Sequence, residues 1–170
     1  MSDYLAKSIH TGRELELMLA GKKPLAVFYA EISELPDEAF IPEDSFAPYV
    51  QGGLFVRSEI VEVEGFVEKL GRRAEIKYVF FARASEAWRI EAMLIVRKSF
   101  KNAKWRWNEA LERIEGTLLG YTEEENDEWC KCSELLMHLR ASAGEIDGAQ
   151  PVYAADGPAS AALPLQPGRS

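Results

Sequence analysis

Apolar residues recur at helical spacing between Asn102 and Gly144, and this is the strongest pattern in the chain. In its first half, four of them lie three or four residues apart, as on one face of a helix: Trp107, Leu111, Ile114 and Leu118. Gly120 follows the last apolar pair and suits the left-handed position that ends a helix. The pattern therefore predicts a helix over residues 103–119.

A second helix is predicted to begin after Thr122, which forms a capping-box pattern with Glu125. Its apolar stripe comprises Trp129, Cys132, Leu136 and Leu139. We expect it to end near Ala141, and the short connecting turn makes the two helices antiparallel, with their apolar stripes forming the seam. Gly116 lies inside the first helix at a cost of about 1 kcal/mol relative to alanine, which indicates close packing against another element.

Three apolar runs before this hairpin predict strands. Residues 24–32 are nonpolar almost throughout, which is typical of a strand covered on both faces. Residues 54–63 form a second strand, with an extension past a bulge at Gly65 to Val67 as the alternative end. Residues 75–82 return after a turn at 70–72, so this pair is antiparallel.

Two shorter patterns predict further helices. Thr11 and Glu14 form a capping box for a short helix that Gly21 ends, after a loosely held start over residues 1–10. Ser85 is a candidate cap for a helix over 86–100. The alternative there is a fourth strand, because residues 88–92 alternate, but the good helix formers in this segment favour the helix.

Together these elements predict an α+β fold in a single globular domain over residues 1–144. It has a small, mainly antiparallel three-stranded sheet, an N-terminal helix, and three C-terminal helices packed on one face. Residues 145–170 hold four prolines, three glycines and six alanines, with Tyr153 as their one aromatic residue. Such a segment buries too little surface to offset its ordering entropy, so we expect a disordered tail.

The composition limits the classes of partner and the cellular compartment that we expect for this protein. The net charge of -8 disfavours long-range attraction to nucleic acids and anionic membranes. The chain has no apolar run of signal-peptide or membrane-spanning length, and Cys130 and Cys132 cannot pair well on one helix. We therefore expect a cytoplasmic protein with reduced thiols. Two cysteines and two histidines do not suit a zinc site, so no metal and no cofactor are expected.

An acidic segment with aromatic residues lies between Pro24 and Val56, where there are six acids and no lysine or arginine. Its prolines at 36, 42 and 48 are expected to break any regular element, leaving at most one helical turn from Asp44 to Tyr49. We predict that it contacts a basic protein partner, with apolar anchors amid the charge: Glu34, Asp37, Glu38, Phe40, Glu43, Phe46 and Tyr49. The alternative is a solubilising loop whose aromatic residues pack on the sheet.

A basic run over residues 97–107 suggests another class of partner. It contains no acid and interleaves cations with aromatic rings, a combination that binds phosphates and stacks on bases. The candidate nucleic-acid-binding residues are Lys98, Lys101, Lys104, Trp105 and Arg106. The alternative is a solvated helix junction whose charges favour a helix C-terminus.

The remaining candidate residues bear on whether the protein binds a partner or catalyses a reaction. Acids over 123–128 suit a helix N-terminus or a docking patch for a basic partner, and Trp88 and Trp105 suit either a homodimer face or the core. The chain lacks the usual motifs for nucleophilic, phosphate-binding or metalloprotease sites. We therefore predict a non-enzymatic interaction or regulatory protein that uses an acidic surface to bind a basic partner. The further alternative is an enzyme with a carboxylate site that only the fold assembles.

Overall fold

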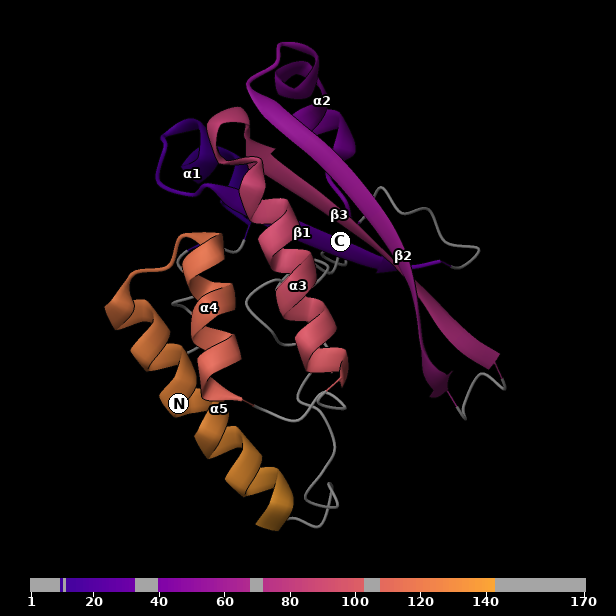
Figure 1. Cartoon of the computed structure of the whole chain (residues 1–170), viewed down its shortest axis with the longest axis vertical. Coiled ribbons are helices and arrows are strands. Elements are labelled where there is room, and N and C mark those ends of the chain that lie inside the picture. The colour runs from indigo at the N-terminus through magenta and orange to yellow at the C-terminus, as the bar shows by residue number, and fades with distance from the viewer. Residues whose placement is uncertain (1–9, 11, 33–39, 68–71, 103–107, 143–170) are drawn as a thin grey trace, which may run out of the picture.

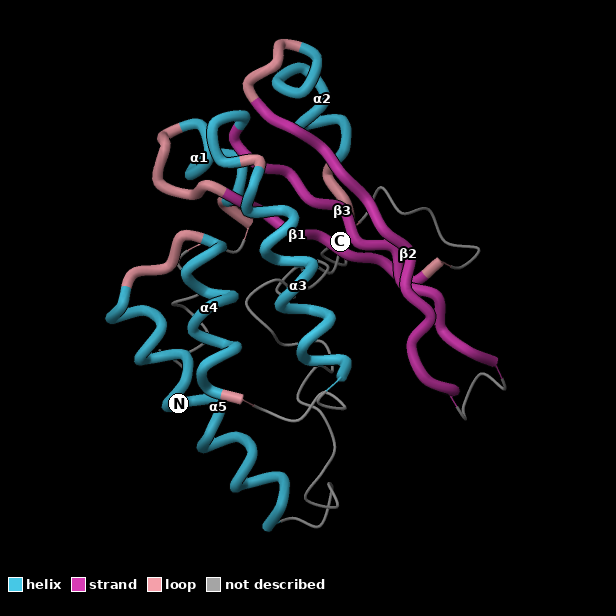
Figure 2. Tube along the Cα trace, in the orientation of Figure 1, coloured by secondary structure: helices cyan, strands magenta, loops and turns pink. Residues whose placement is uncertain are grey.

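A sheet of three antiparallel strands forms the centre of the structure, and helices cover both of its faces (Figures 1 and 2). The structure is a computed structural model that describes residue 10 and residues 12–32, 40–67, 72–102 and 108–142. Within these residues the predicted α+β fold is confirmed, with three helices in the C-terminal part of the chain. The predicted tail over 145–170 lies outside the described residues.

The strands are β1 (Leu25–Glu31), β2 (Phe55–Val67) and β3 (Arg72–Arg83), in the order β1-β3-β2. The central strand β3 pairs antiparallel with both neighbours, so it holds the sheet together. The β2–β3 register shifts between Glu64 and Phe66, which confirms the alternative end of this strand past a bulge at Gly65. β3 begins three residues before its predicted start, and residues 68–71 of the connecting turn lie outside the described residues.

The helices α3 (Trp88–Asn102) and α4 (Glu109–Leu119) pack on one face of the sheet. The core between them is apolar and includes Leu25, Val27, Phe80, Met93, Phe100 and Leu119. The segment over 86–100 is therefore mainly helical, as favoured. Ser85 is not its cap, because it lies within a 3-10 turn, Ala84–Glu86, and the α-helix begins only at Trp88.

The helices α1 (Glu14–Leu19) and α2 (Glu43–Gln51) border the aromatic core on the opposite face. The prediction that Pro48 limits α2 to one turn is wrong, since the helix has nine residues with this proline inside it. An interior proline costs about 3 kcal/mol. Burial of Phe46, which is 1% exposed and stacks on Phe81 at 4.2 Å, offsets this cost. α1 begins at Glu14 after Arg13, which provides no side-chain cap.

The turn between α4 and α5 (Glu123–Ser142) has the predicted caps. Gly120 has φ 89°, and the Thr122 N–H donates to Glu125 Oε2 at 2.7 Å, while the Glu125 N–H donates to Thr122 Oγ1 at 3.2 Å. The predicted start of α4 at residue 103 is wrong. Asn108 is extended, and its Oδ1 accepts the Leu111 N–H at 3.1 Å, so the helix begins at Glu109.

The predicted apolar seam between α4 and α5 is also wrong in the part that the structure describes. Ile114 is exposed, and Leu118 belongs to the core between α3, α4 and the sheet. The buried residues at the α4–α5 contact are mostly polar and small: Glu112, Glu115, Gly116, Asn126, Cys130 and Ser133. The sheet and α3 take the leucine face of α4, so α5 meets the neighbouring face. Gly116 confirms the predicted close packing, because a Cβ there would lie 1.8 Å from Asn126 Oδ1.

Candidate binding groove between α3 and α4

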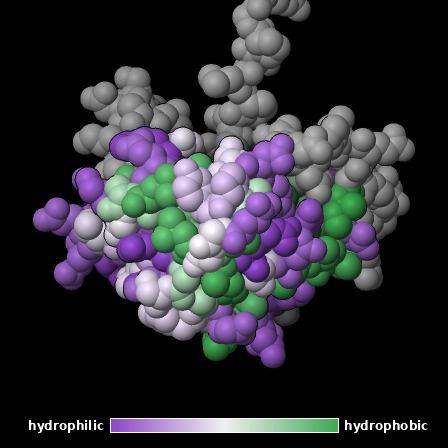
Figure 3. All heavy atoms as spheres, turned by 90° about the horizontal axis from the view of Figure 1, so that it is seen from above, coloured by the Kyte–Doolittle hydropathy of each residue, from purple (hydrophilic) through white to green (hydrophobic). Residues whose placement is uncertain are grey.

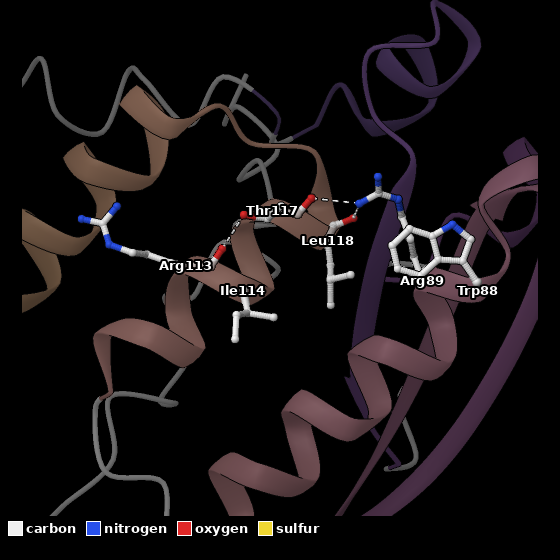
Figure 4. A pocket seen from close by; sticks show the side chains of 6 residues that line it. All are labelled: Trp88, Arg89, Arg113, Ile114, Thr117 and Leu118. Atoms are coloured by element: carbon white, nitrogen blue, oxygen red, sulfur yellow. Dashed lines mark hydrogen bonds between the residues drawn. The ribbon is translucent and has the colours of Figure 1, made fainter.

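A hollow of about 300 Å³ lies where the first turn of α3 meets α4 (Figure 4). Its lining is mainly apolar in character, with arginines at its borders: Trp88, Arg89, Arg113, Ile114, Thr117 and Leu118. We call it the α3–α4 groove. Trp88 stands beside Arg89 at one end, and Ile114 and Leu118 project from α4 on the other side (Figure 4).

Large apolar side chains of the groove are left in solvent. Trp88 is 57% exposed and Ile114 is 48% exposed, although both belong to helices with well-packed inner faces. Ile95, two turns after Trp88 on α3, is exposed as well. The end of the molecule around α1 and α2 also shows hydrophobic patches between hydrophilic side chains (Figure 3). The exposed apolar residues of the groove are clustered, whereas those of an ordinary protein surface are scattered singly.

Arg89 fixes the groove to the end of α4. Its Nη1 donates to the carbonyl oxygens of Thr117 at 3.0 Å and Leu118 at 3.3 Å, at the end of the helix, where the Thr117 carbonyl also accepts the Gly120 N–H at 3.2 Å. The guanidinium also lies 4.8 Å from the Trp88 ring. Its Nε donates to Glu86 at 2.7 Å, and this hydrogen bond holds the pKa of the Glu86 carboxyl below its usual range. Arg89 therefore acts mainly as a fixed structural cation.

Arg113 borders the other end of the groove and joins α4 to α5. Its Nε donates to Glu109 at 2.9 Å and its Nη1 donates to Asp127 at 2.6 Å. Each groove arginine is therefore already matched by carboxylates from its own chain. Glu91 lies one turn after Trp88 and is exposed, so acids outnumber bases around the groove.

The structure places only part of the predicted acidic surface. Glu34, Asp37 and Glu38 lie outside the described residues. Phe40 is exposed. The other three make internal contacts: Glu43 accepts from Arg57 Nε at 2.9 Å, Phe46 is buried, and the Tyr49 ring lies 5.6 Å from the Phe55 ring.

The predicted nucleic-acid surface is also only partly described. Lys98 and Lys101 are exposed on the last turns of α3, whereas Lys104, Trp105 and Arg106 lie outside the described residues. Arg97, in the same basic run, is buried. Its guanidinium lies 3.6 Å from the centre of the Tyr78 ring, and its Nη2 donates to Glu62 at 3.1 Å.

A buried polar cluster joins segments that the sequence pattern did not connect. The His10 ring stacks on Tyr121 at 4.3 Å, and Lys23 Nζ lies 3.2 Å from His10 Nδ1 and donates to the Leu119 carbonyl at 3.2 Å. Burial, with the nearby Lys23 charge, lowers the pKa of His10 to about 4, and burial lowers the pKa of Lys23 to about 8. The expectation of a loosely held start is therefore wrong at His10, which this cluster buries.

A second buried titratable group lies between α4 and α5. Trp129 Nε1 donates to Glu112 Oε2 at 2.9 Å. Burial raises the pKa of the Glu112 carboxyl to about 7, and the nearby Glu115 charge acts in the same direction, against the Trp129 hydrogen bond. No periodicity in the sequence marks either glutamate as buried. Both occupy the face of α4 that α5 covers, away from the groove.

Comparison with other proteins adds no relative. No protein-family model, no curated protein and no solved structure matches this chain. Among the described residues, no group of three or more histidine, cysteine, aspartate and glutamate side chains is arranged to hold a metal ion. Within the same part of the chain, none of the helices has both the length and the apolar character needed to cross a membrane.

Proposed function

We propose that this protein is a non-enzymatic binding module that receives a segment of a protein partner in the α3–α4 groove. The segment presents an apolar side chain to the groove and basic residues to its surroundings. The observation that carries the proposal is Trp88, more than half exposed beside an apolar hollow that it shares with Ile114. Tryptophans next to concave apolar surface are frequent anchors of protein interfaces.

The size of the groove favours a side chain over a whole small molecule. A volume of about 300 Å³ is at the lower limit for small-molecule sites, which span roughly 300–1,000 Å³. An apolar hollow between two helices suits an anchor residue of an amphipathic helix, whose apolar residues recur along one face. Ile95 extends the apolar surface along α3, so an occupant of several turns has more than one contact.

The charges around the groove favour a basic partner, as the sequence pattern predicted. Glu91 lies one turn after Trp88 on α3, and Asp127 of α5 pairs with Arg113 at the border of the groove. The net charge of -8 also attracts cationic partners over long range and speeds their association. A basic amphipathic segment would satisfy both the apolar groove and this acidic surround.

Peptide display tests the proposal and does not require an identified partner. Random peptides of about 15 residues, enough for four helical turns, would be selected against the full chain. We expect enriched peptides to combine large apolar residues with lysine or arginine, and we expect Ile114→Ala and Trp88→Ala to weaken their binding at least tenfold. Leu19→Ala is the matched control, because Leu19 has similar exposure but lies on α1. Equal binding by all three variants would exclude the groove.

The acidic segment remains a second proposed contact for the same class of partner. Phe40 supports it, as a large apolar residue exposed at the described end of this segment. We expect the joint change of Glu34, Asp37 and Glu38 to glutamine to weaken binding of a selected basic peptide mainly at low salt, where surface charges are least screened. Unchanged binding at low salt would remove this segment from the interface.

A further inference from the structure

One edge of the sheet is formed by β2, and its backbone groups alternate in direction. The Ala84 N–H donates to the Leu54 carbonyl at 2.9 Å, which makes residue 54 a hydrogen-bonded position of the β2–β3 ladder. Because such positions alternate in antiparallel pairs, even-numbered residues of β2 direct their backbone groups toward β3. Arg57, Glu59 and Val61 therefore direct their backbone N–H and C=O groups away from β3, along the edge.

Two common devices that prevent strand pairing are missing from this edge. β2 has 13 residues and contains neither proline nor lysine, the residues that most often block an edge. The bulge lies only near its end, between Glu64 and Phe66. Val61 and Val63, which share a face of the strand, are 53% and 46% exposed. A long edge with exposed valines suits pairing with another strand.

We infer that β2 pairs antiparallel with β2 of a second copy of this chain, around a twofold axis at Ser58. In a symmetric antiparallel pair, the side chains of two facing residues must lie on the same face of the sheet. Even-numbered residues of β2 therefore face even-numbered residues of the second copy, and odd-numbered residues face odd-numbered ones. An axis at Glu59 or Glu62 would place a carboxylate opposite its own copy, which is unfavourable.

The axis at Ser58 instead makes opposite charges face each other. Arg57 of each copy lies opposite Glu59 of the other, and in one chain these two side chains already share a face, since Arg57 Nη2 contacts Glu59. The same register places Val56 opposite Ile60 and Phe55 opposite Val61. The exposed Val56 and Val61 thus gain apolar cross-strand neighbours, whereas Val63 lies opposite Gly53, before the start of β2 in the second copy, and the sheet doubles in width.

This arrangement places α2 of both copies on the same face of the doubled sheet, because the twofold axis is perpendicular to the sheet. α2 lies over the start of β2, where the Phe46 ring is 5.9 Å from the Phe55 ring. Because Phe55 faces Val61 across the axis, α2 of the second copy is brought toward Val61 and Val63. These valines lie on the α2 face of the sheet, since Phe55, Val61 and Val63 alternate with the residues that face α3.

Sedimentation of the full chain gives the first test. At physiological ionic strength and concentrations up to about 100 µM, a dimer with a micromolar Kd would be mostly assembled. We expect a dimer under these conditions. A monomer throughout this range would overturn the inference.

Cysteine cross-linking tests the register directly. Residue 58 would face its own copy at a non-hydrogen-bonded position, where Cα atoms are about 4.5 Å apart, within the range that a disulfide spans. Ser58→Cys should therefore form a covalent dimer on mild oxidation. Ile60→Cys is the control, because its two copies would be about 13 Å apart along the strands.

A mixture of Val56→Cys and Ile60→Cys chains should also cross-link, since these positions face each other. The unsubstituted chain, run in parallel, measures any contribution from Cys130 and Cys132. Equal cross-linking of Ser58→Cys and the Ile60→Cys control would overturn the register.

Val61→Pro separates pairing from folding. The Val61 N–H points away from β3, so proline there removes a donor from the free edge and leaves the β2–β3 ladder intact. We expect a monomer with an unchanged circular dichroism spectrum. A folded Val61→Pro variant that remains dimeric would show that the dimer forms elsewhere and would overturn the inference.

Discussion

Two contact regions of this molecule are built on opposite principles. The aromatic core, formed by Phe28, Phe46, Phe55 and Phe81, joins α2 to the sheet through ring contacts between 4.2 and 6.0 Å. The polar seam joins α4 to α5 through Glu112, Glu115, Asn126 and Ser133, all of them buried. Burial of apolar area stabilises the first, whereas the second depends on shape and hydrogen bonds.

The difference indicates which of the two contact regions depends on pH. The aromatic core contains no titratable side chain, so its stability does not depend directly on pH. The polar seam holds a carboxyl whose pKa is raised to about 7. The docking of α5 is therefore sensitive to pH changes near 7 that leave the aromatic contacts of α2 unaffected.

The aromatic core should show the largest mutational effect. Phe46→Ala removes a side chain that is 1% exposed, and we expect a loss of about 3–5 kcal/mol in the free energy of unfolding. Urea unfolding measures it. Phe40→Ala, at an exposed position before α2, is the control and should cost less than about 0.5 kcal/mol. Similar effects at both positions would contradict this account of the core.

The polar seam should show a pH-dependent effect of the next size. The pKa of Glu112 is about 7 in the folded chain, against an ordinary value of 4.5. The folded state thus holds this proton more tightly, so the contribution of Glu112 to stability is greatest below pH 4.5 and is lost as the pH rises through 7.

Glu112→Gln keeps an acceptor for Trp129 without the charge. We expect it to raise the free energy of unfolding at pH 8 by about 2 kcal/mol and to have little effect at pH 4. Chemical unfolding at both values measures the difference. Glu109→Gln, at an exposed site on the same helix, controls for net charge. Equal effects of the two substitutions at pH 8 would show that Glu112 is not desolvated.

The sequence predicted the elements of this fold better than their contacts. The capping box at Thr122 and the left-handed Gly120 are local features, so a few neighbouring residues determine them. The aromatic residues of α2 gave no comparable local signal, because Pro48 argued against a helix. Burial of Phe46 by a distant strand overrode that preference.

The seam and the groove were harder to predict for the same reason. Periodicity identified a leucine face on α4 but could not decide whether α5 or the sheet would cover it. Once the sheet takes that face, Glu112 and Glu115 become buried by default, and Ile114 is left beside the groove. His10 and Lys23 meet only because the fold brings their loops together. In contrast, the exposure of Trp88 excludes the core alternative for this residue, and the homodimer face that its tryptophan content suggested stays a prediction.

Close packing in the polar seam gives a prediction of intermediate size. Alanine favours a helix over glycine by about 1 kcal/mol, so Gly116→Ala would stabilise a solvent-exposed α4. Here the new Cβ would lie 1.8 Å from Asn126 Oδ1, so we expect a net loss of about 1–2 kcal/mol.

The companion variant Asn126→Ala removes the obstructing side chain. In its background, Gly116→Ala should cost less or become stabilising, which a double-mutant cycle of urea unfolding measures. An unchanged cost in the two backgrounds would mean that Asn126 does not set the spacing of the helices.

The turn that positions the polar seam gives the smallest expected effect. Thr122→Ala removes the hydroxyl that accepts the Glu125 N–H at 3.2 Å, and loss of such a cap costs about 1 kcal/mol. Thr117→Ala is the matched control. Thr117 is also exposed, but its hydroxyl donates within α4 to the Arg113 carbonyl at 2.7 Å, a bond that adds little to a helix. If α5 is held mainly by the polar seam, Thr122→Ala should also speed hydrogen exchange in the first turns of α5 while α2 stays protected. Equal acceleration in α2 would mean that both regions open together, and the contrast between them would not hold.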